Sequence, residues 1–222
     1  LGPNGAGKTT SFYMILGIER PSSGIITVDG KDITNIPMYK RAAEGIGYLP
    51  QEASIFRSMS VEDNSRAMLQ NKAKKPDEIE AIVESLIEEF HIGHVRDRMG
   101  MQLSGGERRR VEIARCLALE PNFILLDEPF AGVDPIAVED IQYIVWKLKD
   151  KHIGILITDH NVEETLCITD RAYLLFEGRI LFHGTPEELA DNQTVRDKYL
   201  TNSFKLRKKD FQLMEEQREQ KI

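Results

Sequence analysis

The first residues of the chain have the types and the spacing of a phosphate-binding loop. They match the pattern G-x-x-x-x-G-K-[ST] over residues 2–9. Glycines let consecutive backbone N–H groups curl around an anion, Lys8 places a positive charge on the β- and γ-phosphates, and the Thr9 hydroxyl can bind Mg²⁺. The alternative is a glycine-rich turn with a chance lysine, but the full eight-residue match argues against it. The predicted nucleotide contacts are Gly2, Pro3, Asn4, Gly5, Ala6, Gly7, Lys8, Thr9 and Thr10.

An apolar segment further along the chain ends in two carboxylates. Residues 123–126 are Phe-Ile-Leu-Leu, and Asp127 and Glu128 follow directly. A nearly continuous apolar run suits a parallel strand that is buried on both faces, and nucleotides bind at the carboxyl edge of such sheets. We therefore expect Asp127 to hold Mg²⁺ through water and Glu128 to orient or deprotonate the attacking water.

Two more polar residues follow segments that resemble strands. Gln51 comes after the segment 46–50, and His160 comes after the segment 153–158. The neutral amide of Gln51 can bind both Mg²⁺ and water, while His160 can reach a γ-phosphate and the attacking water. The alternatives are an ordinary loop glutamine and a structural histidine at a strand end. The predicted catalytic residues are Glu128, His160, Lys8 and Gln51, and the predicted Mg²⁺ ligands are Thr9, Gln51 and Asp127.

The segment Leu-Ser-Gly-Gly-Glu at 103–107 is a second anion-binding pattern. Ser104 is a helix N-cap and Glu107 stands at the capping-box position, so a well-capped helix is the simplest interpretation. In addition to this structural role, the N–H groups of Gly105 and Gly106, at a helix N-terminus, can bind a γ-phosphate. The three arginines at 108–110 point to different faces of this helix, so we expect a solvated or salt-bridged surface there.

The elements that position these residues alternate between strands and helices, which predicts an α/β fold with a mainly parallel sheet. Residues 61–119 form a charged helical subdomain, in which apolar positions from Ile79 to Phe90 repeat every 3.6 residues. Predicted helices cover residues 10–16, 38–44, 136–150, 161–169 and 186–200. Predicted strands cover residues 25–28, 46–49, 123–127, 153–158, 171–176 and 179–183.

Composition limits the possible partners. The chain has 222 residues, is 41% hydrophobic and carries a net charge of −7, which argues against nucleic acid as the main partner. No apolar run is long enough to span a membrane, and Cys116 and Cys167 have no metal-ligand spacing. The chain begins within the first motif, so we expect strands that precede it to be missing. The tail at 205–222 is charged, and we expect its last dozen residues to be a solvated or frayed helix.

These motifs together resemble those of the ATP-binding subunits of ABC transporters, and the resemblance spans nearly the whole chain. It rests on the phosphate loop, Gln51, the segments 103–107 and 123–128, the Gly-Val-Asp loop at 132–134 and His160, which occur in the family's order. The resemblance implies a P-loop NTPase core, ATP and Mg²⁺ as cofactors, and a head-to-tail homodimer with two ATP molecules at its interface. The implied contacts from the partner subunit, or near its site, are Ser104, Gly105, Gly106, Glu107 and Asp134.

A closer similarity is to the ATPase subfamily of bacterial lipopolysaccharide export systems. It covers residues 48–57, 104–115, 126–135 and 158–162, and Glu107 replaces the glutamine that is common in the wider family. It implies a protein on the cytoplasmic face of the inner membrane that works with two transmembrane permease subunits. We expect the early strands and the aromatic residue that stacks on adenine to precede residue 1, so no residue of this sequence is assigned to base recognition.

The resemblance also implies a docking groove for the permeases, between the Gln51 loop and the helical subdomain. Phe56, flanked by Arg57, is an apolar anchor for this groove, although it could also pack inside the core. The alternatives in function are the ATP-binding subunit of a branched-chain amino acid importer, a non-transport ABC ATPase and a nucleotide-binding regulator. Glu128 and His160 oppose the last of these, because a regulator needs no hydrolysis.

Overall fold

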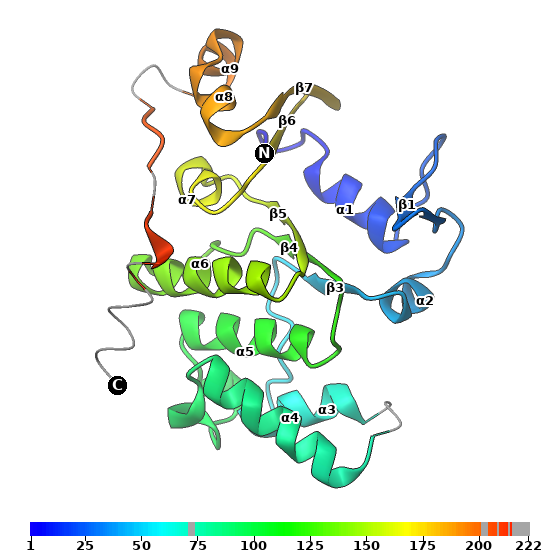
Figure 1. Cartoon of the computed structure of the whole chain (residues 1–222), viewed down its shortest axis with the longest axis vertical. Helices are drawn as coiled ribbons and strands as arrows, with labels where there is room; N and C mark the ends of the chain where they lie inside the picture. Colours follow the sequence, from blue (N-terminus) through cyan, green and yellow to red (C-terminus); the bar gives the residue numbers. More distant parts are fainter. Residues whose placement is uncertain (71–73, 201–203, 208, 213, 215–222) are drawn as a thin grey trace.

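A three-stranded parallel sheet lies at the centre of the protein. The computed structural model describes residues 1–70, 74–200, 204–207, 209–212 and 214 (Figure 1). The sheet has the order β3-β4-β5, formed by Ile46–Leu49, Phe123–Asp127 and Gly154–Thr158. In this register Leu125 lies beside Tyr48 on one side and Leu156 on the other. The carboxyl ends of all three strands therefore meet at one edge, and these three predicted strands are confirmed.

Helices cover both faces of this sheet. On one face α1 (Lys8–Leu16) buries Phe12 and Leu16 against Leu125, whereas α5 (Gly105–Leu117) and α6 (Pro135–Asp150) cover the other face. Because side chains alternate along a strand, Ile124 and Leu126 point to the second face and join the largest apolar cluster. Figure 1 shows this order, with α5 and α6 stacked on the side of the sheet away from α1.

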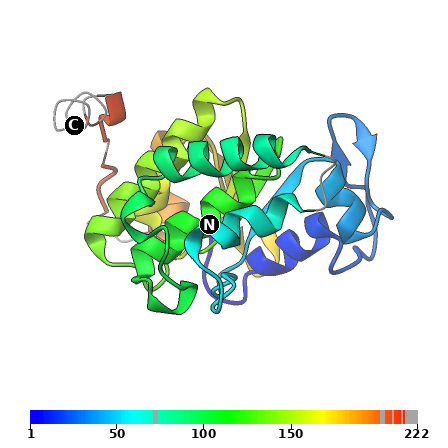
Figure 2. The same ribbon diagram turned by 90° about the horizontal axis from the view of Figure 1, so that it is seen from below.

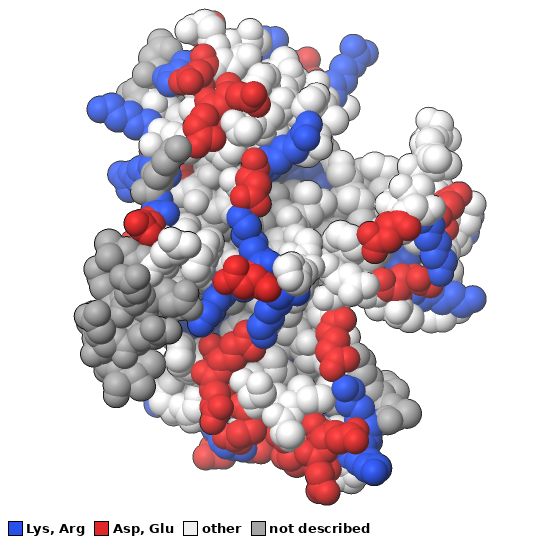
Figure 3. All heavy atoms as spheres, in the orientation of Figure 1, with Lys and Arg blue, Asp and Glu red and all other residues white. Residues whose placement is uncertain are grey.

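The helical part of the chain continues this second layer. It contains α3 (Val61–Leu69) and α4 (Pro76–Glu89), which pack against each other, and α3 packs against α5 (Figures 1 and 2). The apolar stripe of α4 is buried at Val83, Leu86 and Ile87, as its periodicity predicts. Its outer face is acidic, and the acidic side chains gather at this end of the molecule (Figure 3). Within the described residues, no helix combines the length and apolar character that crossing a membrane requires.

The C-terminal part is a separate small layer next to the phosphate loop. A hairpin of β6 (Ala172–Phe176) and β7 (Arg179–Gly184) is followed by α8 (Pro186–Asp191) and α9 (Gln193–Lys198). The single helix expected over 186–200 is therefore two, because the Asn192 side chain caps α9 at the break. Leu1 lies beside β6, where its backbone hydrogen-bonds with Tyr173 and Leu175. The remaining elements are β1 (Thr27–Val28), β2 (Lys31–Asp32), α2 (Met38–Ala43), the short 3₁₀ turns Gly93–Val95 and Gly100–Gln102, and α7 (Val162–Leu166).

The segment that follows α9 packs on α6, contrary to the expectation of a solvated end. Phe211 is 5% exposed, and its ring stacks on Trp146 at a centroid distance of 5.7 Å. Lys209 donates a hydrogen bond to Gln142 at 2.7 Å and lies 3.3 Å from Glu139. The expectation is wrong at Phe211, because the aromatic ring finds an apolar surface on α6. Residues 213 and 215–222 lie outside the described part of the chain.

A buried arginine ties the end of α1 to the β1–β2 region. Arg41 is 2% exposed, and its guanidinium donates hydrogen bonds to four carbonyl groups. Two of them, on Met14 at 2.7 Å and Ile15 at 2.6 Å, belong to the last turn of α1, where helical carbonyls lack partners within the helix. The other two belong to Thr34 at 2.8 Å and Ile36 at 2.6 Å. Arg41 thus fixes the far end of the helix that follows the phosphate loop.

We expect Arg41→Met to lower the free energy of unfolding by about 3 kcal/mol, because charged hydrogen bonds contribute about 1.5–3 kcal/mol each and the freed carbonyls stay buried. Urea denaturation measures this value. The matched control is Arg20→Met, at an exposed arginine, which should change the value by less than about 0.5 kcal/mol. Equal stability of the two variants would mean that water replaces the guanidinium of Arg41.

Candidate functional site

The predicted phosphate loop folds as a tight turn that opens into α1. Gly2 has a φ of 149°, and a Cβ there would lie 2.3 Å from the Leu175 carbonyl oxygen, so no larger residue fits. The ammonium group of Lys8, a residue only 8% exposed, donates to the carbonyls of Gly2 at 2.7 Å and Pro3 at 3.0 Å. These contacts hold the lysine across the loop, with the amino end of α1 directly behind it.

This loop forms one wall of a cleft of about 530 Å³. The opposite wall comes from the loops that follow β3, β4 and β5, so residues far apart in the sequence line one space. The lining residues are Asn4, Gly5, Gly7, Lys8, Thr9, Thr10, Gln51, Glu128 and His160. The structure thus brings together the four predicted catalytic residues and two of the three predicted Mg²⁺ ligands, Thr9 and Gln51.

Three of the predicted catalytic residues meet at a single oxygen atom. The amide of Gln51 donates to Glu128 Oε2 at 2.9 Å, and His160 Nδ1 lies 3.3 Å from the same atom. The backbone of Glu128 has a φ of 45°, in the left-handed region that side chains rarely adopt, and its N–H donates to the Thr158 carbonyl at 2.7 Å. The turn after β4 therefore directs this carboxylate toward the loops that follow β3 and β5.

Asp127 lies deeper than Glu128. It is 2% exposed, and one of its carboxylate oxygens accepts a hydrogen bond from the Thr158 hydroxyl of the neighbouring strand. Burial, together with this carboxylate, raises the pKa of Tyr48 on the other neighbouring strand. The Thr9 hydroxyl and the Gln51 amide border the cleft itself. Oxygen donors of this kind suit Mg²⁺, which normally takes one or two protein ligands and completes its shell with phosphates and water.

Two residues that the sequence did not single out support this arrangement. Asp159 is fully buried, its carboxylate accepts the N–H groups of Phe130 at 3.3 Å and Asn161 at 2.7 Å, and burial raises its pKa. The hydroxyl of Tyr199, at the end of α9, accepts the N–H of Gly2 at 3.2 Å. The position of Asp159, next to His160 at a strand end, was a usable signal, whereas nothing near Tyr199 in the sequence pointed to the loop.

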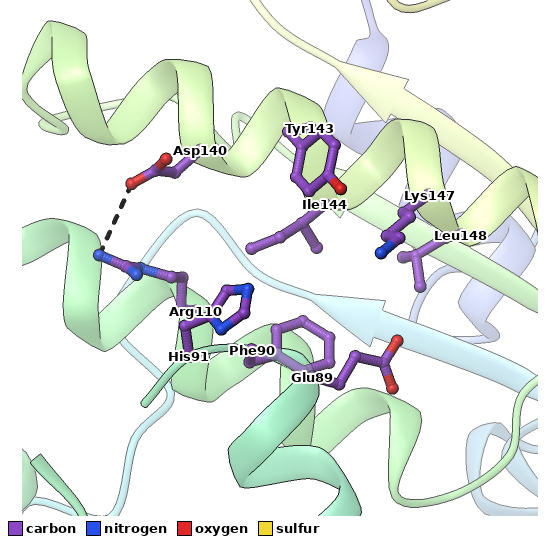
Figure 4. Close-up of a pocket in the computed structure, with 9 residues that line it drawn as sticks. All are labelled: Glu89, Phe90, His91, Arg110, Asp140, Tyr143, Ile144, Lys147 and Leu148. Atoms are coloured by element: carbon purple, nitrogen blue, oxygen red, sulfur yellow. Dashed lines mark ion pairs between the residues drawn. The ribbon is translucent and has the colours of Figure 1, made fainter. Parts of the chain in front are cut away.

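The expectation of a solvated or salt-bridged surface at residues 108–110 is wrong at the middle residue, which is buried. Arg109 is 5% exposed, and its guanidinium donates to carbonyl oxygens at the ends of β3 and β4. Arg110 does pair with Asp140 of α6 at 3.7 Å, beside a small crevice between α4, α5 and α6 (Figure 4). The helical spacing turns one arginine inward, where backbone carbonyls supply the acceptors it needs.

The second anion-binding segment lies outside this cleft. Ser104 caps α5 through Glu107 N–H, and the Glu107 side chain accepts from Ser104 N–H at 2.8 Å, which confirms the capping box and lowers the pKa of Glu107. Asp134 caps the neighbouring helix α6 by accepting from Ala137 N–H at 3.0 Å. A Cβ on Gly106 would lie 2.5 Å from the Ala137 Cβ, so the glycine permits close packing of the two helix ends. The two segments predicted to bind anions therefore lie on separate parts of the chain.

Comparison with known proteins defines the class. The sequence model of the family described as "ABC transporter" matches residues 1–131, more than half of the chain. The chain therefore belongs to the ABC transporter family, among the ATP-binding subunits that hydrolyse ATP for transport.

Within this family, the chain is similar to several ATP-binding proteins of bacteria. It is 56% identical over 207 residues to the lipopolysaccharide export system ATP-binding protein LptB of Haemophilus influenzae, covering 93% of this chain and 86% of that protein. The same figures hold for LptB of Escherichia coli. It is also 57% identical over 210 residues to a probable ABC transporter ATP-binding protein of Azorhizobium caulinodans, with coverages of 93% and 73%.

Solved structures agree on the fold. The chain superposes on cbiO1 of Clostridium perfringens, part of the ABC transporter complex cbiONQ, with a TM-score of 0.80, 32% identity and coverages of 97% and 85%. It superposes on the ADP conformation of MJ1267, an ATP-binding cassette of an ABC transporter, with a TM-score of 0.79, 30% identity and coverages of 91% and 86%. The expected α/β P-loop fold is confirmed.

Proposed function

We propose that this chain powers the export of lipopolysaccharide, from extraction at the inner membrane toward the outer membrane. The observation that carries the hydrolytic part is the meeting of Gln51 and His160 at one oxygen of Glu128, opposite the phosphate loop. The transported molecule is inferred from the 56% identity to LptB of two bacteria. The branched-chain amino acid importer has no comparable support.

In the proposed reaction the loop at 2–10 binds the phosphates of ATP, and Lys8 turns from the loop carbonyls to the β- and γ-phosphates. Glu128 accepts a proton from a water molecule, whose oxygen attacks the γ-phosphorus as the bond to the β-phosphate oxygen breaks. His160 and Gln51 orient that water and the γ-phosphate. Thr9 and Gln51, with Asp127 through water, would hold Mg²⁺, which would neutralise charge on the phosphates.

The second surface assigns a role to a second copy of the chain. ATP-binding subunits of ABC transporters work as dimers with membrane permeases. We assign Ser104, Gly105, Gly106 and Glu107 to the γ-phosphate held by the opposite subunit, because helix N-termini bind anions. Asp134 caps the adjacent helix, so it would lie near the same nucleotide. Loss of the γ-phosphate on hydrolysis would remove the bridge between subunits and open the dimer.

The permease docking surface is assigned to Phe56 and Arg57. Phe56 is 43% exposed, so its side chain does not pack inside the core. The guanidinium of Arg115 lies 4.3 Å from the centre of its ring, which holds the ring at the surface. A groove of about 230 Å³ opens nearby between α2, β3 and α5. Docking there would place the subunit on the cytoplasmic face of the inner membrane.

The test of this function uses the full-length protein, tagged and gently extracted from its native membranes. Mass spectrometry then identifies the proteins that co-purify. Two permease subunits of a lipopolysaccharide exporter are expected. Amino acid permeases would transfer the chain to the importer class, and the absence of any membrane partner would contradict a transport function.

We expect Phe56→Ala to weaken this assembly at least about tenfold while ATP affinity stays within about twofold, because a buried aromatic anchor contributes roughly 2 kcal/mol or more to an interface. Co-purification yield and nucleotide titration measure the two effects. The matched control is Ile180→Ala, at an exposed apolar residue of β7. Equal losses of assembly and ATP affinity would reject the docking role.

We expect Glu128→Gln to bind ATP and to dimerise but to hydrolyse ATP at least about 100-fold more slowly, because an amide cannot accept the proton of the attacking water. Phosphate release and ATP-dependent dimerisation by light scattering measure these effects. Glu88→Gln, on the exposed face of α4, is the matched control and should hydrolyse normally. Near-normal turnover in Glu128→Gln would remove Glu128 from the catalytic role.

A further inference from the structure

A buried ion pair on α5 joins two regions to which separate roles have been assigned. Arg109 and Glu112 lie one turn apart on this helix, and their side chains approach to 3.2 Å. Both residues are almost fully enclosed, at 5% and 3% exposure. The pair does not line the phosphate cleft, so its hydrogen bonds must explain why two charges are buried.

The carboxylate of Glu112 holds the loop that precedes Phe56. Its Oε1 atom accepts the backbone N–H of Ser54 at 2.7 Å and of Ile55 at 3.1 Å. A single acceptor on α5 thus fixes two consecutive peptide units next to the proposed docking residue. A charged acceptor makes these hydrogen bonds stronger than neutral ones.

The guanidinium of Arg109 holds the ends of two strands. It donates to Pro50 O at 2.8 Å, directly before Gln51, and to Asp127 O at 3.2 Å. It also donates to Glu128 O at 3.4 Å and Pro129 O at 3.2 Å, within the turn that directs the Glu128 carboxylate. Three of these four carbonyls belong to the turn at 127–129.

Two further side chains bind the backbone of residues 54–56, called the docking loop below, to neighbouring helices. Arg115, also on α5, donates to Ser54 O at 2.8 Å. Asn64 of α3 is fully buried, accepts Phe56 N–H at 2.9 Å and donates to the carbonyl of Phe56 at 3.0 Å. The backbone around Phe56 is therefore bound to helices on both sides, and a force on the Phe56 ring reaches α5 through hydrogen bonds.

We infer that the Arg109–Glu112 pair is a positioning device that links the permease docking loop to Glu128. Displacement of the loop by a docked permease moves Glu112, Glu112 moves Arg109, and Arg109 shifts the turn that holds the catalytic carboxylate relative to Gln51. The pair does not line the phosphate cleft, and Glu112 borders the groove near Phe56, so the pair sets the distance between the two regions. This inference rests on the proposed function and adds the route by which docking regulates hydrolysis.

The arrangement has a physical advantage over apolar packing. Carbonyls and N–H groups at strand ends and in loops need partners when buried, and the pair supplies a cation to the carbonyls and an anion to the N–H groups. Each contact is directional, so a small displacement at one end changes the geometry at the other. Misplacement of a catalytic group by about 1 Å can lower a rate by about 100-fold.

The test compares complexes of the full-length protein with its permeases, purified by a tag on a permease so that every ATPase subunit measured is assembled. We expect Glu112→Gln to lower kcat for ATP about tenfold while KM for ATP stays within about twofold, because the phosphate loop is untouched. Arg109→Lys should behave alike, since an ammonium group cannot reach all the carbonyls that the guanidinium fork binds. The matched controls are Glu80→Gln and Arg66→Lys, an exposed pair between α3 and α4.

A double-mutant cycle separates coupling from simple structural support. Phe56→Ala and Glu112→Gln are measured singly and together in assembled complexes. If docking acts through the pair, the double variant should have the kcat of Glu112→Gln alone, because the route is already broken. Effects that multiply, or a loss in KM equal to the loss in kcat, would overturn the inference. Arg109→Lys, which retains the buried charge, replaces Glu112→Gln in the cycle if that variant does not fold.

The wild-type and Glu128→Gln complexes are measured beside these variants. Failure to recover a permease complex, or normal hydrolysis by Glu128→Gln, would count against the proposed function. If the permease complex is recovered and Glu128→Gln is inactive, a normal kcat in Glu112→Gln and Arg109→Lys would count against the positioning role alone.

Discussion

The site depends on the parallel alignment of β3, β4 and β5. Because these strands are in register, the residues that follow them meet at one edge of the sheet: Gln51, the pair Asp127 and Glu128, and His160. Two hydrogen bonds keep the ends of β4 and β5 in this register. The Thr158 hydroxyl donates to Asp127, and the Glu128 N–H donates to the Thr158 carbonyl. A shift of one residue in any of the strands would turn its polar group away from the phosphate loop.

The sequence predicted the parts of the structure that follow from local pattern. The buried strands at 46–49 and 123–127, the capped helix after Ser104 and the phosphate loop each have a signature within a few residues. The convergence of Gln51, Glu128 and His160 was also predictable, because parallel strands expose their carboxyl ends on one side. The assignment of Glu128 itself needed the phosphate loop as context, since two carboxylates after an apolar run are common.

The features that escaped prediction depend on partners far away in the sequence. Arg109 looks like a surface arginine until the ends of β3 and β4 supply buried carbonyls around it. Phe211 stands in a charged tail, and the stacking of its ring on the partly buried Trp146 of α6 explains its burial. Tyr199 reaches Gly2 across almost the whole chain. Periodicity and capping rules describe one element at a time, so contacts of this kind lie beyond them.

The left-handed backbone at Glu128 has a consequence for how this position can vary. A φ of 45° is comfortable for glycine and asparagine but costs free energy for a longer side chain. Selection for stability alone would therefore drive this residue toward glycine or asparagine and would extinguish the carboxylate. In a library of variants selected only for folding, activity would therefore be lost at this residue without a loss of stability.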